Sequence, residues 1–113
     1  MLRLADVRSS ELKFMTREEI IEKLKAMEPE LRARGITRMQ MFGSRARGDN
    51  REDSDLDLLI EVDPKLKISL IELAGIHLDL SEAFGIEANL FEPHGLGHRM
   101  AKRIEGDLIP VFA

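Results

Sequence analysis

The spacing of hydrophobic positions along the chain changes several times, and each spacing predicts a helix or a strand. Thr16 and Glu19 form the pattern of a capping box, and an apolar stripe at helical spacing follows them. We therefore expect a first helix over residues 16–27. Pro29 suits the first turn of a helix, so a kinked continuation should start near it and be closed by Gly35.

Beyond Gly35 the pattern alternates between strands and helices. Apolar runs and turn residues predict strands over 36–42, 56–62, 87–91 and 108–112, and helices over 69–84 and 96–104. This order indicates an α+β (α/β) fold, in which helices pack on a mixed β-sheet of about four strands.

The chain has 113 residues, which suits a single domain. Residues 1–113 contain no internal repeat or low-complexity linker that would divide them. Residues 1–15 carry the weakest pattern and are interpreted as a candidate N-terminal arm. We therefore expect one core and one functional site.

Composition narrows the classes of function. Charged residues make up 34% of the chain, and no apolar run approaches the length of a membrane span or signal, so a cytoplasmic protein without a membrane partner is expected. The absence of cysteine excludes disulfides and thiolate zinc sites. A net charge of −4 argues against direct nucleic-acid binding but leaves room for a small anionic ligand.

Asp55 and Asp57 are the first candidates for chemistry. They are two residues apart on a predicted strand, so their side chains leave the same face and can converge. One or two carboxylates, completed by water and substrate phosphates, are a common magnesium site. An acidic strand end that merely points into water is the alternative for an isolated Asp-x-Asp pattern.

Gly43 and Ser44 precede this pair at the end of a predicted strand and favour the metal interpretation. A glycine lets the backbone approach a phosphate closely, and free amides with a serine hydroxyl can donate hydrogen bonds to it. Arg45 and Arg47 are candidates for neutralising phosphate charge, with Arg47 as a candidate phosphate ligand, although either could equally pair with Asp49 or Glu52 and only shape the loop. Phosphate and metal would then meet at one point.

These motifs together resemble the signature of the DNA polymerase beta superfamily. The chain reads Met-Phe-Gly-Ser-Arg-Ala-Arg-Gly-Asp over 41–49, and ten residues separate Gly43-Ser44 from Asp55-Leu56-Asp57. The short length and the Ala-Arg-Gly run are similar to its minimal nucleotidyltransferase branch, which includes MntA-type antitoxins paired with HEPN-domain toxins. The resemblance extends over residues 36–111 and implies the nucleotidyltransferase fold.

The resemblance also implies roles for individual residues. Gly43 and Ser44 would contact the nucleotide phosphates, and Asp55 and Asp57 would hold two Mg²⁺ ions. The implied reaction transfers a nucleoside monophosphate, AMP from ATP, to an acceptor with release of pyrophosphate. For an antitoxin of this branch, the implied acceptor and partner is a HEPN toxin.

Asn89 departs from the family pattern, which has a third catalytic carboxylate on the next strand. An amide oxygen can ligate a metal, but it is neutral and cannot accept a proton as a carboxylate does. Slow transfer is therefore expected. Glu87 lies on the same predicted strand face and could compensate, although it is displaced by about 6.6 Å along the strand.

The predicted helix over 69–84 and the histidines complete the set of candidates. Apolar positions of this helix spread over roughly 240° of the helical wheel, more than one sheet can cover. A homo-oligomer or partner chain could cover the rest, and so could the N-terminal arm. Structural or surface roles are favoured for His77, His94 and His98, because none has a ligand-spaced partner on its own element.

Two main hypotheses follow for the activity. One is an ATP- and Mg²⁺-dependent transferase that modifies its toxin. The other is a weakened transferase-like antitoxin that neutralises the toxin by binding alone. Transfer to a small molecule is a third hypothesis, disfavoured because a short chain offers no separate acceptor domain.

Overall fold

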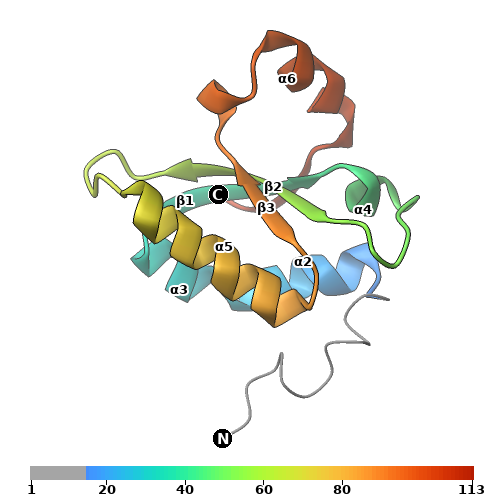
Figure 1. Ribbon diagram of the computed structural model, residues 1–113, viewed down its shortest axis with the longest axis horizontal. Helices are drawn as coiled ribbons and strands as arrows, with labels where there is room; N and C mark the ends of the chain where they lie inside the picture. Colours follow the sequence, from blue (N-terminus) through green and yellow to red (C-terminus); the bar gives the residue numbers. More distant parts are fainter. Residues whose placement is uncertain (1–14) are drawn as a thin grey trace, which may run out of the picture.

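In the computed structural model, which describes residues 15–113, helices and strands begin and end near the capping and turn residues of the sequence (Figure 1). The helices are α2 (Arg17–Ala26), α3 (Glu28–Ala33), α4 (Ser44–Arg47), α5 (Leu70–Phe84) and α6 (His98–Ile104), with 3-10 turns η1 (Pro93–Gly95) and η2 (Glu105–Asp107). The strands are β1 (Ile36–Phe42), β2 (Leu56–Val62), β3 (Ala88–Phe91) and β4 (Ile109–Phe112).

The strands form one mixed sheet in the order β3-β2-β1-β4. β1 pairs antiparallel with both β2 and β4, whereas β2 and β3 are parallel because α5 crosses between them. The predicted α+β fold with a mixed four-stranded sheet is therefore confirmed. This topology leaves β3 at one edge of the sheet and brings the start of β2 beside the start of β3.

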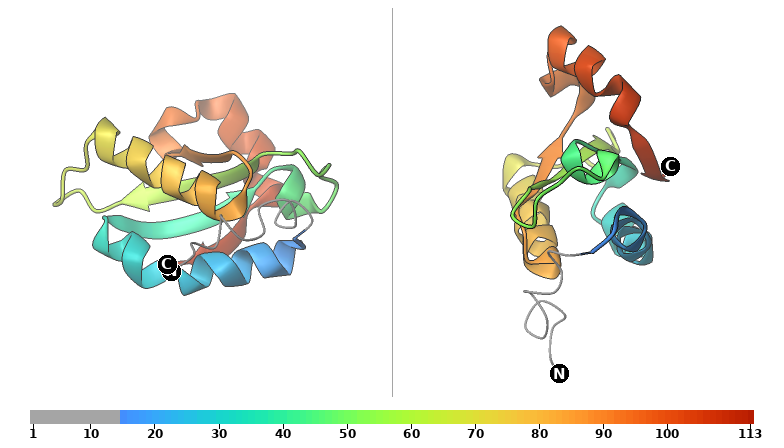
Figure 2. Two further views of the ribbon diagram at one scale, coloured as in Figure 1. Left: turned by 60° about the horizontal axis from the view of Figure 1, so that its bottom comes forward. Right: turned by 90° about the vertical axis from the view of Figure 1, so that its right-hand side faces the viewer.

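Side-chain alternation along the strands separates a large core from a small one. Leu56, Leu58 and Ile60 on β2 are buried against α2, α3 and α5, which cover one face of the sheet (Figure 2). On the other face Leu59 joins Phe42 and Ile104 in a smaller cluster beneath α6. The side chain of Asp57 alternates with those of Leu56 and Leu58 and thus emerges on the α6 side.

The predicted starts of α2 and α5 are confirmed by their caps. Thr16 and Glu19 form the capping box of α2. The Thr16 amide donates to the Glu19 carboxylate at 2.9 Å, and the Glu19 amide donates to the Thr16 hydroxyl at 3.1 Å. Ser69 caps α5 by accepting from the amide of Glu72, and Gly85 ends this helix at φ +68°. A short α3 follows α2, as Pro29 predicted.

Three boundaries differ from the prediction. The last helix starts at His98 rather than near residue 96, because Gly97 precedes it at φ +76°, outside helical geometry. A 3-10 turn fills the preceding stretch. The strands β3 and β4 each start one residue later than expected, since Glu87 and Leu108 lie just outside the ladders.

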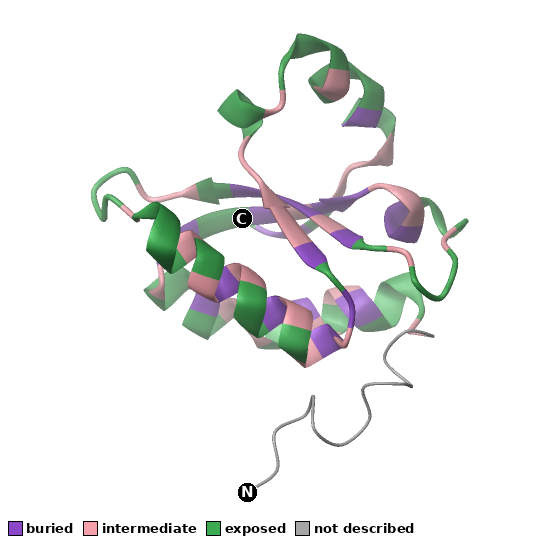
Figure 3. Cartoon of the chain, viewed as in Figure 1, coloured by how far each residue is buried: buried purple, intermediate pink, exposed green. Residues whose placement is uncertain are grey.

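Helix α5 keeps an exposed apolar stripe, as its wide arc predicted. Ile76, Leu80 and Phe84 are buried, but Leu70 and Ile71 are 83% and 85% exposed among the described residues (Figure 3). Of the predicted N-terminal arm, residues 1–14 lie outside the described part of the chain, and Met15 packs against the core. None of the helices within residues 15–113 has the length and apolar content needed to cross a bilayer.

Candidate active site

Three candidate residues meet where β2 and β3 begin. Asp57 stands directly opposite Asn89 in the parallel register, and Asp55 immediately precedes β2. The Asn89 amide nitrogen donates to Asp55 Oδ2 at 3.1 Å and to Asp57 Oδ1 at 3.4 Å. A half turn of the amide would present its oxygen at the same point, since its two ends are nearly isosteric. The tertiary structure therefore gathers these three side chains at one point, and their catalytic and metal-binding roles stay predictions.

The environment of Asp57 disfavours its own charge. Burial raises the pKa of this carboxyl above its ordinary value, and the nearby Asp55 carboxylate adds to the effect. The hydrogen bond from Asn89 acts in the opposite direction by stabilising the carboxylate. A cation between the two carboxylates would offset this cost, so the geometry suits a site that gains by binding one.

Gly43 brings the backbone against Asp57. It ends β1 and precedes α4 at φ +82°, and a Cβ atom at this position would lie 2.7 Å from Asp57 Oδ2. Any side chain would therefore meet the carboxylate as well as the strain of a positive φ. Its carbonyl accepts from the amides of Ala46 and Arg47, both at 3.0 Å, which starts the short helix.

We expect Gly43→Ala to lower the free energy of unfolding and to displace Asp57. Gly48→Ala is the matched control, because Gly48 has φ +85° but nothing lies within 4 Å of a Cβ placed there. Gly48→Ala should lose about 1–2 kcal/mol in urea unfolding because Gly48 is in the left-handed region, and Gly43→Ala should lose at least as much because its φ of +82° and ψ of −163° suit only glycine. Only Gly43→Ala should also lose the Mg²⁺-dependent rise in melting temperature with ATP. Equal nucleotide responses in the two variants would contradict the close approach to Asp57.

Ser44 lies at the first position of α4, beside Gly43. Within residues 15–113 its hydroxyl has no protein hydrogen-bond partner, and the side chain is half-buried rather than enclosed. It is therefore available to an incoming acceptor oxygen. Its role as a phosphate ligand stays a prediction.

Arg45 holds the loop that carries the aspartates. Its side chain is only 1% exposed, and its guanidinium donates to the carbonyls of Ser54 at 2.9 Å and Glu52 at 3.1 Å. Burial lowers the pKa of this guanidinium, and the charges of Asp53 and Asp55 oppose that shift. Arg45 therefore fixes the approach to Asp55, the loop-shaping alternative considered from the sequence.

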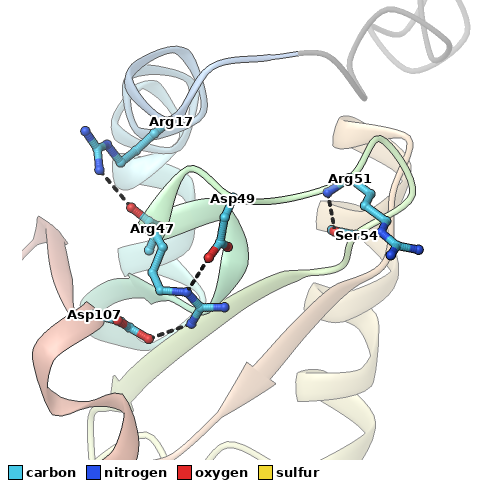
Figure 4. Close-up of polar contacts among 7 residues, drawn as sticks. Arg17, Arg47, Asp49, Arg51, Ser54 and Asp107 are labelled. Carbon is cyan, nitrogen blue, oxygen red and sulfur yellow. Dashed lines mark hydrogen bonds and ion pairs between the residues drawn. The ribbon is translucent and has the colours of Figure 1, made fainter.

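Arg47 is oriented by two carboxylates. It donates to Asp49 at 3.1 Å and to Asp107 at 2.8 Å, and Arg17 donates to the carbonyl of Ala46 next to it at 2.8 Å (Figure 4). The pairing with Asp49 is the loop-shaping contact that the sequence offered as the alternative to phosphate binding. Arg47 nevertheless borders the same cavity as Asp57, so a phosphate role remains a prediction.

A cavity of about 460 Å³ opens beside Gly43 and Asp57. It is lined by Phe42, Gly43, Arg47, Asp57, Met100, Arg103, Ile104 and Asp107. Four of these residues come from α6 and η2. No local sequence pattern predicted that these two elements lie over the end of β1. The only sequence signal was the basic last turn of α6.

Glu87 points toward α5. Its Oε1 lies 2.9 Å from His77 Nε2, while His77 Nδ1 lies 2.6 Å from the Ala88 carbonyl oxygen. His77 thus has a structural role at the sheet edge, as favoured from the sequence. In the described residues no group of three or more His, Cys, Asp or Glu side chains forms a metal cluster, and the third polar side chain beside Asp55 and Asp57 is the amide of Asn89.

Comparisons with known proteins identify a family and several relatives of this chain. The family model for the nucleotidyltransferase domain matches residues 10–110. Protein adenylyltransferase MntA of Thermococcus cleftensis is 32% identical over 98 residues, covering 86% of this chain and 97% of that protein. A candidate protein adenylyltransferase of Methanocaldococcus jannaschii is 30% identical over 84 residues, covering 74% of this chain and 88% of that protein.

Solved structures share the fold. A candidate minimal nucleotidyltransferase superposes with a TM-score of 0.71 at 31% identity, covering 85% of this chain and 96% of that one. A toxin–antitoxin structure with AMP-PNP superposes with a TM-score of 0.64 at 15% identity, covering 79% and 71%. The family match and the common fold together show that this chain belongs to the nucleotidyltransferase domain family, with relatives among the MntA-like protein adenylyltransferases.

Proposed function

We propose that this protein is a Mg²⁺-dependent nucleotidyltransferase that transfers AMP from ATP to a HEPN-domain toxin and thereby acts as its antitoxin. The observation that carries this proposal is the meeting of Asp55, Asp57 and Asn89 beside Gly43, where no side chain would fit. The choice of ATP as the substrate is supported by two comparisons. One relative is a protein adenylyltransferase, and one structural neighbour was solved with AMP-PNP.

The donor set fits Mg²⁺. Asp55 and Asp57 offer carboxylate oxygens, and Asn89 offers an amide oxygen after a half turn, all of them hard ligands. We assign Asp55 and Asp57 as the ligands of two Mg²⁺ ions. When bound, Mg²⁺ would neutralise phosphate charge and polarise the phosphoryl group.

The surrounding residues orient the triphosphate. Gly43 allows its close approach, and the Ser44 hydroxyl donates a hydrogen bond to a phosphate oxygen. Arg47 supplies positive charge from the same cavity. The acceptor oxygen then bonds to the α-phosphorus of ATP, the bond from that phosphorus to its bridging oxygen breaks, and pyrophosphate leaves with the released charge.

Asn89 favours a second candidate function. As a neutral amide it can position an attacking hydroxyl but cannot take its proton, which passes to water or another base. Glu87 is held by His77 and is a poor replacement in this arrangement. The slower the transfer becomes, the more neutralisation would depend on binding the toxin alone.

The assay is incorporation of label from ATP, labelled on its α-phosphate, into the purified HEPN-domain partner. We expect Mg²⁺-dependent incorporation with one pyrophosphate released for each AMP transferred. No incorporation, with the toxin still neutralised on mixing, would support the binding-only antitoxin. Neither incorporation nor neutralisation would overturn both functions.

A further inference from the structure

The outer edge of β3 exposes part of its backbone next to the candidate active site. The amide of Leu56 on β2 donates to the Glu87 carbonyl at 2.8 Å, so odd-numbered residues of β3 bond inward to β2. Even-numbered residues therefore direct their amides and carbonyls outward. Of these, Ala88 is capped by α5, because Ser81 Oγ accepts from its amide at 2.9 Å and His77 approaches its carbonyl.

Leu90 is the next residue with an outward-directed backbone. Neither its amide nor its carbonyl has a side-chain partner of this kind among residues 15–113. An edge strand with open backbone groups is a template for pairing with another extended segment. The capping of Ala88 by α5 limits such pairing to the end of β3 that carries Leu90.

A largely apolar groove lies along this open edge. Its volume is about 440 Å³, and α5 and β3 form its walls. The residues of α5 and β3 that line the groove and bear on docking are Leu70, Leu73, Ala74, His77, Leu90 and Phe91. Asn89 also lines the groove, so β3 separates the groove on its α5 side from the candidate active site on its other face.

We propose that an extended segment of the acceptor protein docks in this groove as an additional strand against Leu90. The proposal rests on the proposed function and deepens it by stating how the acceptor reaches the site. In a sheet, side chains directly opposite each other on adjacent strands share a face. Residues of the segment opposite Leu90 would therefore enter the apolar groove, while their neighbours would emerge on the face of Asn89 and Asp57.

This alternation defines the chemistry of the docked segment. Its groove-facing residues are apolar, and a Ser, Thr or Tyr between them stands about one strand spacing, ~4.8 Å, from Asn89. Its hydroxyl is thus delivered to the carboxylates by the backbone register. Glu92 follows β3 at the end that carries Leu90, lines the groove and favours Lys or Arg in the segment.

The first test compares two exposed positions of α5. Leu70 lines the groove and Ile71 does not. Both side chains are largely exposed, at 83% and 85%, so neither substitution should affect folding. We expect Leu70→Asp to weaken binding of the purified HEPN-domain partner at least tenfold, and Ile71→Asp to change it less than twofold. Both should keep the rise in melting temperature with Mg²⁺ and ATP. Equal binding losses, or none, would overturn the groove.

The second test is amide hydrogen exchange on the full chain, resolved by residue. Adding the partner should slow exchange at Leu90 at least tenfold, whereas Asn89, whose amide is directed toward β2, serves as the control. Unchanged exchange at Leu90 in the complex would overturn strand addition. Slow exchange at Leu90 in the chain without its partner would also overturn strand addition. If that protection were independent of concentration, the chain's own residues would cover β3; if it depended on concentration, a second copy would.

These readouts separate the two proposals. Protection of Leu90 and the Leu70→Asp effect without AMP incorporation would keep the docking mode and overturn the transferase. AMP incorporation without protection of Leu90 would keep the transferase and overturn the docking mode. Absence of any binding to the partner would overturn the docking mode outright.

Discussion

Asn89→Asp is expected to speed AMP transfer by about a hundred- to ten-thousandfold, the usual contribution of a positioned general base. The substitution keeps the side-chain volume and places a third carboxylate within reach of Asp55 and Asp57, which Asn89 already contacts at 3.1 and 3.4 Å. The new carboxylate can accept the proton of the attacking hydroxyl. The measurement is single-turnover incorporation of labelled AMP into the HEPN-domain partner at saturating Mg²⁺ and ATP.

The same substitution should destabilise the protein when Mg²⁺ is absent. It removes two donated hydrogen bonds and adds a like charge beside two carboxylates, one of which already has a raised pKa. We therefore expect a lower melting temperature without Mg²⁺ and recovery of most of the loss with it. A faster enzyme with a greater need for the metal is the combined signature of a restored metal ligand.

Glu87→Gln is the companion variant. If Glu87 is held by His77 as described, this substitution should leave wild-type transfer within a factor of about two, because the pair holds Glu87 away from the reacting centre and is itself partly exposed to solvent. Fast wild-type transfer that depends on Glu87 would show that it has taken over as base. Fast transfer indifferent to both positions would refute the placement of Asn89 at the reacting centre.

Replacing both aspartates, Asp55→Asn with Asp57→Asn, is expected to abolish transfer and the Mg²⁺-dependent response to ATP. Neutral amides remove the charge that attracts a divalent cation, while the shapes of the side chains are kept. Thermal melting with Mg²⁺, ATP and both together measures the coupling. The matched control is Glu52→Gln with Asp53→Asn, which removes two exposed charges from the same loop and should leave the coupling intact.

The double variant should also change how stability depends on pH when Mg²⁺ is absent. The pKa of Asp57 is raised in the folded state, so its ionisation costs stability as pH rises from the ordinary value of an Asp through the raised one. Above that window the double variant should be at least as stable as the wild type. A large loss of stability without Mg²⁺ would indicate that the two carboxylates hold the fold together instead of serving a ligand.

The sequence alone determined the elements and the candidate residues, because the signals involved are local. Thr16 and Ser69 start helices by accepting hydrogen bonds from amides three residues away. Gly85 ends α5 in a left-handed backbone conformation, which is costly for residues with a side chain. The spacing of Gly43-Ser44 and Asp55-x-Asp57 is likewise local, since one loop joins the two strands. Such features depend on backbone geometry over a few residues and can be predicted without knowledge of packing.

Only the tertiary structure decided which distant residues share the site. The register that sets Asp57 opposite Asn89 depends on how α5, which connects β2 to β3, packs on the face of the sheet, and nothing near Asn89 in the sequence specifies it. The same holds for Glu87, which turns to His77, and for α6, which brings Arg103 to the cavity. These contacts join residues far apart along the chain, and their geometry is fixed by burial of the whole core rather than by local pattern.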